Sequence, residues 1–155
     1  MAAAGSLIPF AKNIPDFRMR DLVGATVKLA LLTSAATPDT SVTGHSIWAD
    51  LSASEIAALG GYNAGGKALT SMAIAAISNG WKFSSADVAW LATGVDIAAH
   101  RYGVLVVSGT LWSMVNPLVG VFVVDATPAD KPPTTVGNTL AHYCPAAGWF
   151  DSSKS

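Results

Sequence analysis

The chain has 155 residues, of which 51% are hydrophobic and only 12% are charged, and nine basic residues nearly balance ten acidic ones. A chain of this length is expected to form one domain with a core that needs no metal or disulfide. The lack of a basic run argues against nucleic acid and anionic membranes as partners. The low share of charged residues predicts that other protein covers part of the surface.

The N-terminus does not have the pattern of a signal peptide. The stretch Met1–Ser6 carries no positive side chain, and Pro9, Lys12 and Pro15 interrupt the apolar residues that follow. No apolar run approaches the ~20 residues needed to span a bilayer. We therefore expect the protein to be made and assembled in a cytoplasm. Cys144 is the one cysteine, which excludes an internal disulfide, and we interpret it as a buried, inert thiol rather than a nucleophile.

Residues 1–24 are predicted to form an extended N-terminal arm. Pro9 and Pro15 prevent a regular helix through this stretch, although many of its side chains are apolar. Such a segment packs either along its own domain or against a neighbouring subunit, and the sequence leaves both open. The apolar side chains are Leu7, Ile8, Phe10, Ile14, Phe17, Met19 and Leu22.

The next part of the chain predicts a strand, a loop and one short helix. Residues 25–33 alternate two apolar faces and predict a strand, and the Ser-, Thr-, Pro- and Asp-rich residues 34–46 predict a loop. Ser52 and Glu55 have the spacing of a capping box, which predicts a helix over residues 53–59 that ends at Gly60.

A hairpin is predicted after this helix. Residues 67–77 are compatible with a helix or a strand, and Asn79-Gly80 favours the strand because this pair is typical of a tight turn. The return strand begins at Trp81, and residues 88–91 continue as strand.

Two Val-rich runs, residues 101–107 and 117–125, are the most strongly β-forming part of the chain. Both faces of each run are apolar, which predicts central strands covered on both sides, in a sandwich or at a subunit interface. We expect a stiff exposed loop over Thr127–Thr134, a last strand over residues 135–143 and an apolar anchor at Trp149 and Phe150. The prediction is an all-β, single-domain β-sandwich or barrel-like fold over residues 25–150, with a flexible tail over 151–155.

No catalytic, cofactor or metal site is readable. His45, His100 and His142 lack the spacing of metal ligands, and no nucleophile elbow of the Gly-x-Ser-x-Gly type occurs. The carboxylates are interpreted as loop and cap groups, and Asp50 is a candidate ion-pair partner for Arg101.

The five tryptophans are interpreted as core or interface residues. The alternative is a carbohydrate-binding module that uses exposed tryptophans, with Trp48, Trp112 and Trp149 as the candidates.

The order of several motifs resembles a family of small virion proteins of tailed bacteriophages. Residues 47–52 read Ile-Trp-Ala-Asp-Leu-Ser, and residues 61–66 read Gly-Tyr-Asn-Ala-Gly-Gly. Arg-Tyr at 101–102, Pro-Leu-Val-Gly at 117–120 and Ala-Ala-Gly at 146–148 follow in the same order as in that family. The likeness covers residues 25–150, while the apolar arm and the Trp149-Phe150 end depart from the family pattern.

This resemblance implies a non-enzymatic head protein, with a capsid decoration or cement protein as the preferred function. Its partners would be the major capsid protein and further copies of itself, as dimer or trimer, on the outside of the capsid after assembly in the host cytoplasm. A head-fibre base or a tail component is the alternative. The loop over Thr127–Thr134 is one expected contact element. The expected contact residues are Leu7, Ile8, Phe10, Ile14, Phe17, Met19, Leu22, Trp112, Trp149 and Phe150.

Overall fold

A computed structural model describes residues 7–125 and 129–153. The chain is mostly β, with 37% strand and 13% helix. The strands form several antiparallel sheets, and the described residues close no barrel. The predicted β-rich fold is confirmed, and the barrel-like alternative is not supported.

The main sheet has five strands in the order β1-β10-β7-β2-β3, and every neighbouring pair is antiparallel. Its centre is built from β2 (Val27–Leu32), β7 (Tyr102–Val107) and β10 (Leu118–Val123), which are three of the predicted strands. The short strands β1 (Ile8–Pro9) and β3 (Lys67–Ala68) form its two edges.

Both faces of the main sheet are buried, as its composition predicts. In β2, Val27, Leu29 and Leu31 face one apolar cluster, and Ala30 and Leu32 face a second cluster on the other side. Because successive side chains of a strand point to opposite faces, a strand in contact with two cores must be apolar at almost every position.

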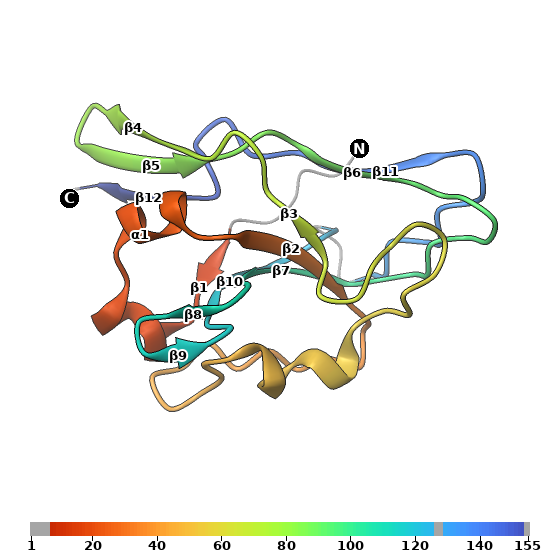
Figure 1. Ribbon diagram of the computed structural model, residues 1–155, viewed down its shortest axis with the longest axis horizontal. Helices are drawn as coiled ribbons and strands as arrows, with labels where there is room; N and C mark the ends of the chain where they lie inside the picture. Colours follow the sequence, from red (N-terminus) through yellow and green to blue (C-terminus); the bar gives the residue numbers. More distant parts are fainter. Residues whose placement is uncertain (1–6, 126–128, 154–155) are drawn as a thin grey trace.

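A second layer of strands covers one face of the main sheet (Figure 1). It contains a three-stranded sheet of β4 (Ala73–Ile77), β5 (Gly80–Ser84) and β12 (Phe150–Ser153), in the order β12-β5-β4. Beside it, β6 (Val88–Leu91) pairs with β11 (Thr139–His142). Large side chains of this layer, including Phe83, Trp90, Leu140 and Trp149, enter the core that it shares with the main sheet.

The predicted β4–β5 hairpin is confirmed, with Ser78 and Asn79 in its turn. The predicted strand over residues 67–77 is divided, because β3 joins the main sheet while β4 joins the second layer. The break at residues 108–116 contains a further small hairpin, β8 (Thr110–Leu111) and β9 (Met114–Val115), that the sequence did not indicate.

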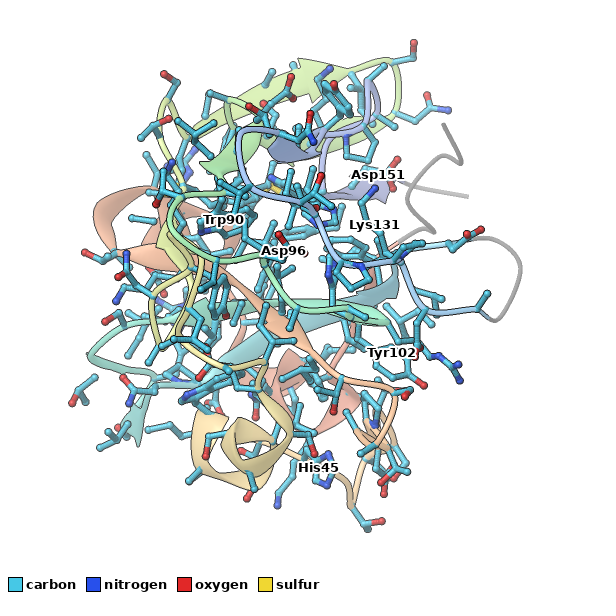
Figure 2. The ribbon with its side chains drawn as sticks, turned by 90° about the vertical axis from the view of Figure 1, so that its right-hand side faces the viewer. His45, Trp90, Asp96, Tyr102, Lys131 and Asp151 are labelled. Atoms are coloured by element: carbon cyan, nitrogen blue, oxygen red, sulfur yellow. The ribbon has the colours of Figure 1, made fainter. Side chains whose placement is uncertain are left out.

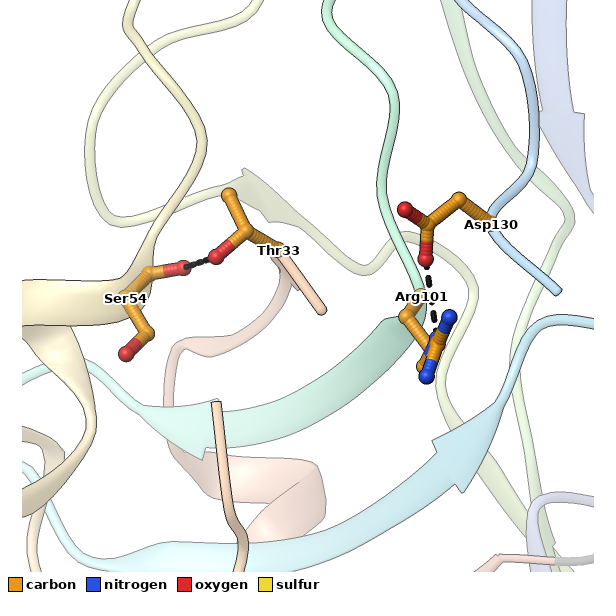
Figure 3. Close-up of polar contacts among 4 residues, drawn as sticks. All are labelled: Thr33, Ser54, Arg101 and Asp130. Atoms are coloured by element: carbon orange, nitrogen blue, oxygen red, sulfur yellow. Dashed lines mark hydrogen bonds and ion pairs between the residues drawn. The ribbon is translucent and has the colours of Figure 1, made fainter. Parts of the chain in front are cut away.

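The predicted helix over residues 53–59 is wrong. Two single 3-10 turns, η2 (Trp48–Asp50) and η3 (Ser52–Ser54), precede an extended Glu55 that makes a β-bridge with Leu32. The Glu55 carboxylate does not return to the Ser52 amide, because it accepts hydrogen bonds from Tyr62 Oη at 2.7 Å and from the Gly65 amide at 2.6 Å. Thr33 binds the carbonyl of Ser54 and holds η3 against the end of β2 (Figure 3).

The N-terminal segment is not extended over most of its length. After β1 come the 3-10 helix η1 (Ala11–Asp16) and the short helix α1 (Met19–Gly24), while residues 1–6 lie outside the described residues. Phe10 and Leu22 are buried in the two cores. Of the two placements that the sequence left open, this segment packs along its own domain.

The predicted flexible tail begins with ordered strand. Residues 151–153 belong to β12, which pairs with β5 in the register Asp151↔Lys82, and residues 154–155 lie outside the described part of the chain. The last predicted strand, residues 135–143, shortens to β11.

Candidate protein-binding groove

An apolar groove lies between the N-terminal segment and the residues that lead into β12. Its volume is about 380 Å³, and its walls include Leu7, Pro9, Phe17, Val119, Trp149 and Phe150. Four of these residues are among the contact residues predicted from the sequence. They come from opposite ends of the chain, so the groove forms only because β1 pairs with β10 and β12 pairs with β5.

Aromatic rings packed against one another hold the groove in shape. Phe17 lies 5.1 Å from Phe150 and 5.3 Å from Trp112 between ring centroids, and Phe150 stacks on Phe83 at 5.2 Å. The Trp112 indole N–H also donates to Asp21 at 2.9 Å, which links the β8–β9 hairpin to α1. Each aromatic ring pair contributes about 0.5–1.5 kcal/mol beyond the buried area, which favours one packed arrangement of this wall.

Gly148 sets the entry into this wall. Its φ of +83° is a backbone conformation that favours glycine, and a Cβ there would lie 2.4 Å from the Phe83 carbonyl oxygen. The close approach lets the Trp149 amide bond that same carbonyl at 2.8 Å. Trp149 is thereby directed into the core, where its ring lies 5.7 Å from Phe122.

The structure divides the ten predicted contact residues into distinct groups. Phe10, Leu22 and Trp149 are 1%, 0% and 3% exposed, so their side chains serve the chain's own core before any partner. Ile8 and Ile14 are 52% and 51% exposed. The remaining five are partly buried against the larger core: Leu7, Phe17, Met19, Trp112 and Phe150.

The second predicted contact element, Thr127–Thr134, lies partly outside the described residues, which resume at Ala129. Asp130 accepts a hydrogen bond from Arg101 Nε at 2.8 Å and forms an ion pair with that side chain (Figure 3). Lys131 and Thr134 make backbone bridges to His100 and Ile97. The described end of this loop is therefore tied to the residues before β7.

The proposed pairing of Asp50 with Arg101 is wrong. The Asp50 carboxylate accepts the backbone amides of Ser46 at 2.8 Å and Ile47 at 3.1 Å, and these bonds lower the pKa of Asp50. Asp39 likewise accepts the nearby Ser41 amide, which confirms the predicted local role there. Asp87 and Asp96 instead accept the amides of Cys144 and Val136, which are distant in the sequence.

The histidines contain a relationship that the sequence did not reveal. His100 and His142 are 1% and 4% exposed, and their Nε2 atoms lie 3.2 Å apart. Burial lowers the pKa of His100 to about 4 and that of His142 to about 3. Figure 2 shows His45 at the far end of the molecule from Trp90, whose ring packs on His142, so the three histidines do not form one site.

The remaining candidates are the cysteine and the tryptophans. Cys144 is a partly buried free thiol, and burial raises its pKa. Trp90 and Trp149 are buried, Trp48 and Trp112 are partly buried, and Trp81 is 49% exposed. Trp81 is therefore the most exposed tryptophan, and it is not one of the three candidates named for carbohydrate binding.

Across residues 7–125 and 129–153, no group of three or more His, Cys, Asp or Glu side chains is placed to hold a metal ion. None of the helices in those ranges has the length and hydropathy needed to cross a bilayer. Comparison with known protein families, with curated proteins and with solved structures finds no match for this chain.

Proposed function

We propose that this chain is a non-enzymatic structural protein of a tailed-bacteriophage head, a decoration or cement protein that bridges neighbouring capsid subunits on the outside of the shell. Its scaffold is a single-domain β-sandwich. The motif order from Trp48 to Gly148 supports the class of protein, and the apolar groove supports the mode of action.

One observation carries the binding role. The groove is apolar, and on the other side of β1 the half-exposed Ile8 lines a second apolar pocket with Tyr102 and Val121. Ile14, in η1, is a further half-exposed apolar residue of the N-terminal segment. Exposed apolar surface on both sides of one edge strand supports a protein interaction site along this segment. An exposed loop or side chain of the capsid protein that carries an apolar residue would complement it.

Bridging many identical sites suits a weak individual contact. A cement protein that contacts two subunits at once gains from the high effective concentration of the second site. Each contact then needs only a modest apolar area, such as one groove and two isoleucines provide.

The test is binding to heads of the parent phage that lack this protein. Ile8→Asp and Ile14→Asp should each weaken binding, because each places a charge on an apolar contact. Val42→Asp is the matched control, since Val42 is 73% exposed in the loop before η2, outside the N-terminal segment, and lines neither the groove nor the pocket of Ile8. Wild-type affinity in both isoleucine variants would contradict the assignment of this surface.

Deleting residues 1–20 would not test the surface cleanly, because Phe10 and Asn13 are part of the buried structure.

Electron microscopy of labelled virions separates cement from the alternatives. Label over the whole shell supports the proposal, whereas label at one vertex or on the tail identifies a fibre base or a tail component instead.

A further inference from the structure

The strand β4 presents an open edge. It is the outermost strand in the order β12-β5-β4, and no described residue pairs with its outer side. In Figure 1 it lies along the upper rim of the molecule. Its residues, Ala73–Ile77, are all alanine or isoleucine. An uncharged edge of this kind is a template for pairing with another strand.

The other outer strands of the two larger sheets are protected. β1 contains Pro9, β3 contains Lys67 and β12 contains Asp151. Proline and charged side chains are the usual means by which an edge strand avoids pairing with a foreign strand. β4 has neither, so it is the unprotected outer strand of these two sheets.

The register of the hairpin determines which backbone groups point outward. Ile77 and Gly80 flank the two-residue turn and form a hydrogen-bonded pair, and such pairs alternate along an antiparallel ladder. The N–H and C=O groups of Ile74 and Ala76 therefore point away from β5. Phe83 is the partner of Ile74 in the hairpin, and its backbone points away from β4 in the same way. Its carbonyl accepts the Trp149 amide on the side of β12.

We propose that β4 pairs antiparallel with β4 of a second copy of this chain, around a two-fold axis at Ala75. In this register Ile74 of each copy lies opposite Ala76 of the other. The outward groups of these residues then form four hydrogen bonds, and the two three-stranded sheets become one sheet of six strands. The edge is uncharged, so identical copies meet without repulsion, and the two-fold axis closes the assembly at a dimer.

Side chains next to the edge add apolar contact. Trp81 lies directly opposite Ala76 in the hairpin, so both are on one face of the sheet. Trp81 is 49% exposed and, with Met19 and Ile74, forms the apolar half of the lining of a cavity of about 380 Å³ between α1 and the hairpin. Arg18, Arg20 and Asp21 form the charged half. The small Ala76 leaves room for Trp81 to reach Ile74 of the second copy. This dimer does not depend on the proposed function, because the head shell takes no part in it.

Sedimentation of the full-length protein over a wide concentration range tests the dimer. Ala76→Pro removes an outward N–H and leaves the ladder to β5 intact, so it should raise the dimer dissociation constant roughly 30-fold by removing two of four bonds. A wild-type protein that stays monomeric throughout the range would overturn the proposal, as would an oligomer that Ala76→Pro does not weaken.

Disulfide trapping tests the register even where the proline variant does not fold. In a Cys144→Ser background, Ala75→Cys places two thiols opposite each other at the axis, within the reach of a disulfide. Ala73→Cys is the matched control on the same strand and face, and its two thiols would lie about 13 Å apart along the strands. Rapid cross-linking of the Ala75 variant alone is expected. Cross-linking of the Ala73 variant instead, or of neither, would overturn the register.

Discussion

His100 Nε2 and His142 Nε2 lie 3.2 Å apart in the core, between β11 and the residues that lead into β7. Two neutral imidazoles can share this contact only when one Nε2 carries a proton and the other accepts it. A further proton would place N–H against N–H in an apolar site that includes Trp90 and Phe122. The nearby charged groups are Lys131, which further lowers both pKa values, and Asp130, which raises that of His100.

This pair predicts a loss of stability in acid. Both folded-state pKa values, about 4 and about 3, lie below the ordinary value of 6.5, so the unfolded chain binds more protons in that window. The stabilisation is complete above pH 6.5 and is lost as the pH falls towards 4, by about 1.4 kcal/mol per pH unit for each histidine. Urea unfolding at several pH values measures the slope.

His142→Gln should reduce that slope by about half, because one titrating group is lost. An equal slope in wild type and His142→Gln would contradict the assignment to the buried pair.

Tyr62 is predicted to be a key buried polar group. Its hydroxyl accepts the Leu31 amide at 3.0 Å and donates to Glu55 at 2.7 Å, and the residue is 2% exposed. Tyr62→Phe leaves the Leu31 amide without this acceptor, which should lower the free energy of unfolding by about 1–3 kcal/mol. Tyr143→Phe is the control, because Tyr143 is 48% exposed. Equal stability of the two variants in urea unfolding would rule out this role.

Asn13 is predicted to fasten the N-terminal segment to the main sheet. Its side-chain amide donates to the Leu118 carbonyl at 2.8 Å and to the Ser46 carbonyl at 2.7 Å, and its oxygen accepts from Ser46 Oγ at 2.9 Å. Asn13→Ala should cost about 1–3 kcal/mol and speed proteolytic cleavage within residues 11–24. Lys12→Ala, at an exposed neighbouring position, should do neither. Unchanged cleavage in Asn13→Ala would argue against the fastening role.

Gly66 and Gly94 form a matched pair for separating a steric clash from backbone strain. Their φ angles are +79° and +74°, but a Cβ at Gly66 would lie 2.1 Å from the Leu29 carbonyl oxygen, whereas a Cβ at Gly94 meets nothing within 4 Å. Gly94→Ala should cost about 1–2 kcal/mol from the left-handed backbone alone. Gly66→Ala should cost clearly more, as thermal unfolding would report. Similar costs would mean that β2 can move aside.

The parts of the fold that follow from local pattern are predictable from the sequence. The alternation in residues 27–32 and the Val-rich runs that became β7 and β10 depend only on neighbours along the chain. Ser78 to Gly80 is a further local signal, and the hairpin is found there.

The failures arise where a distant residue competes for a group. Glu55 has the spacing of a capping box, but Tyr62 and Gly65 take its carboxylate, so the chain makes only the single turn η3 and not the predicted helix over residues 53–59. Asp130, not Asp50, reaches Arg101. His100 and His142 are 42 positions apart, and only the pairing of β6 with β11 and the packing of that pair beside β7 bring them together.

The candidate groove is predictable only in part. Its apolar residues are visible in the sequence, but the meeting of Phe17 with Phe150 depends on the two ends of the chain lying side by side. The sequence also did not separate the exposed Ile8 and Ile14 from the buried Phe10 and Leu22, because all four are simply apolar.

Saturation binding to heads tests the central claim most directly. Purified protein is titrated onto heads of the parent phage that lack it, and bound copies per head are counted after sedimentation. A cement protein should saturate at many copies per head, in proportion to the repeating sites of the shell, and Ile14→Asp should weaken its binding. Absence of binding at every concentration, or saturation at a number that only one vertex can hold, would contradict it.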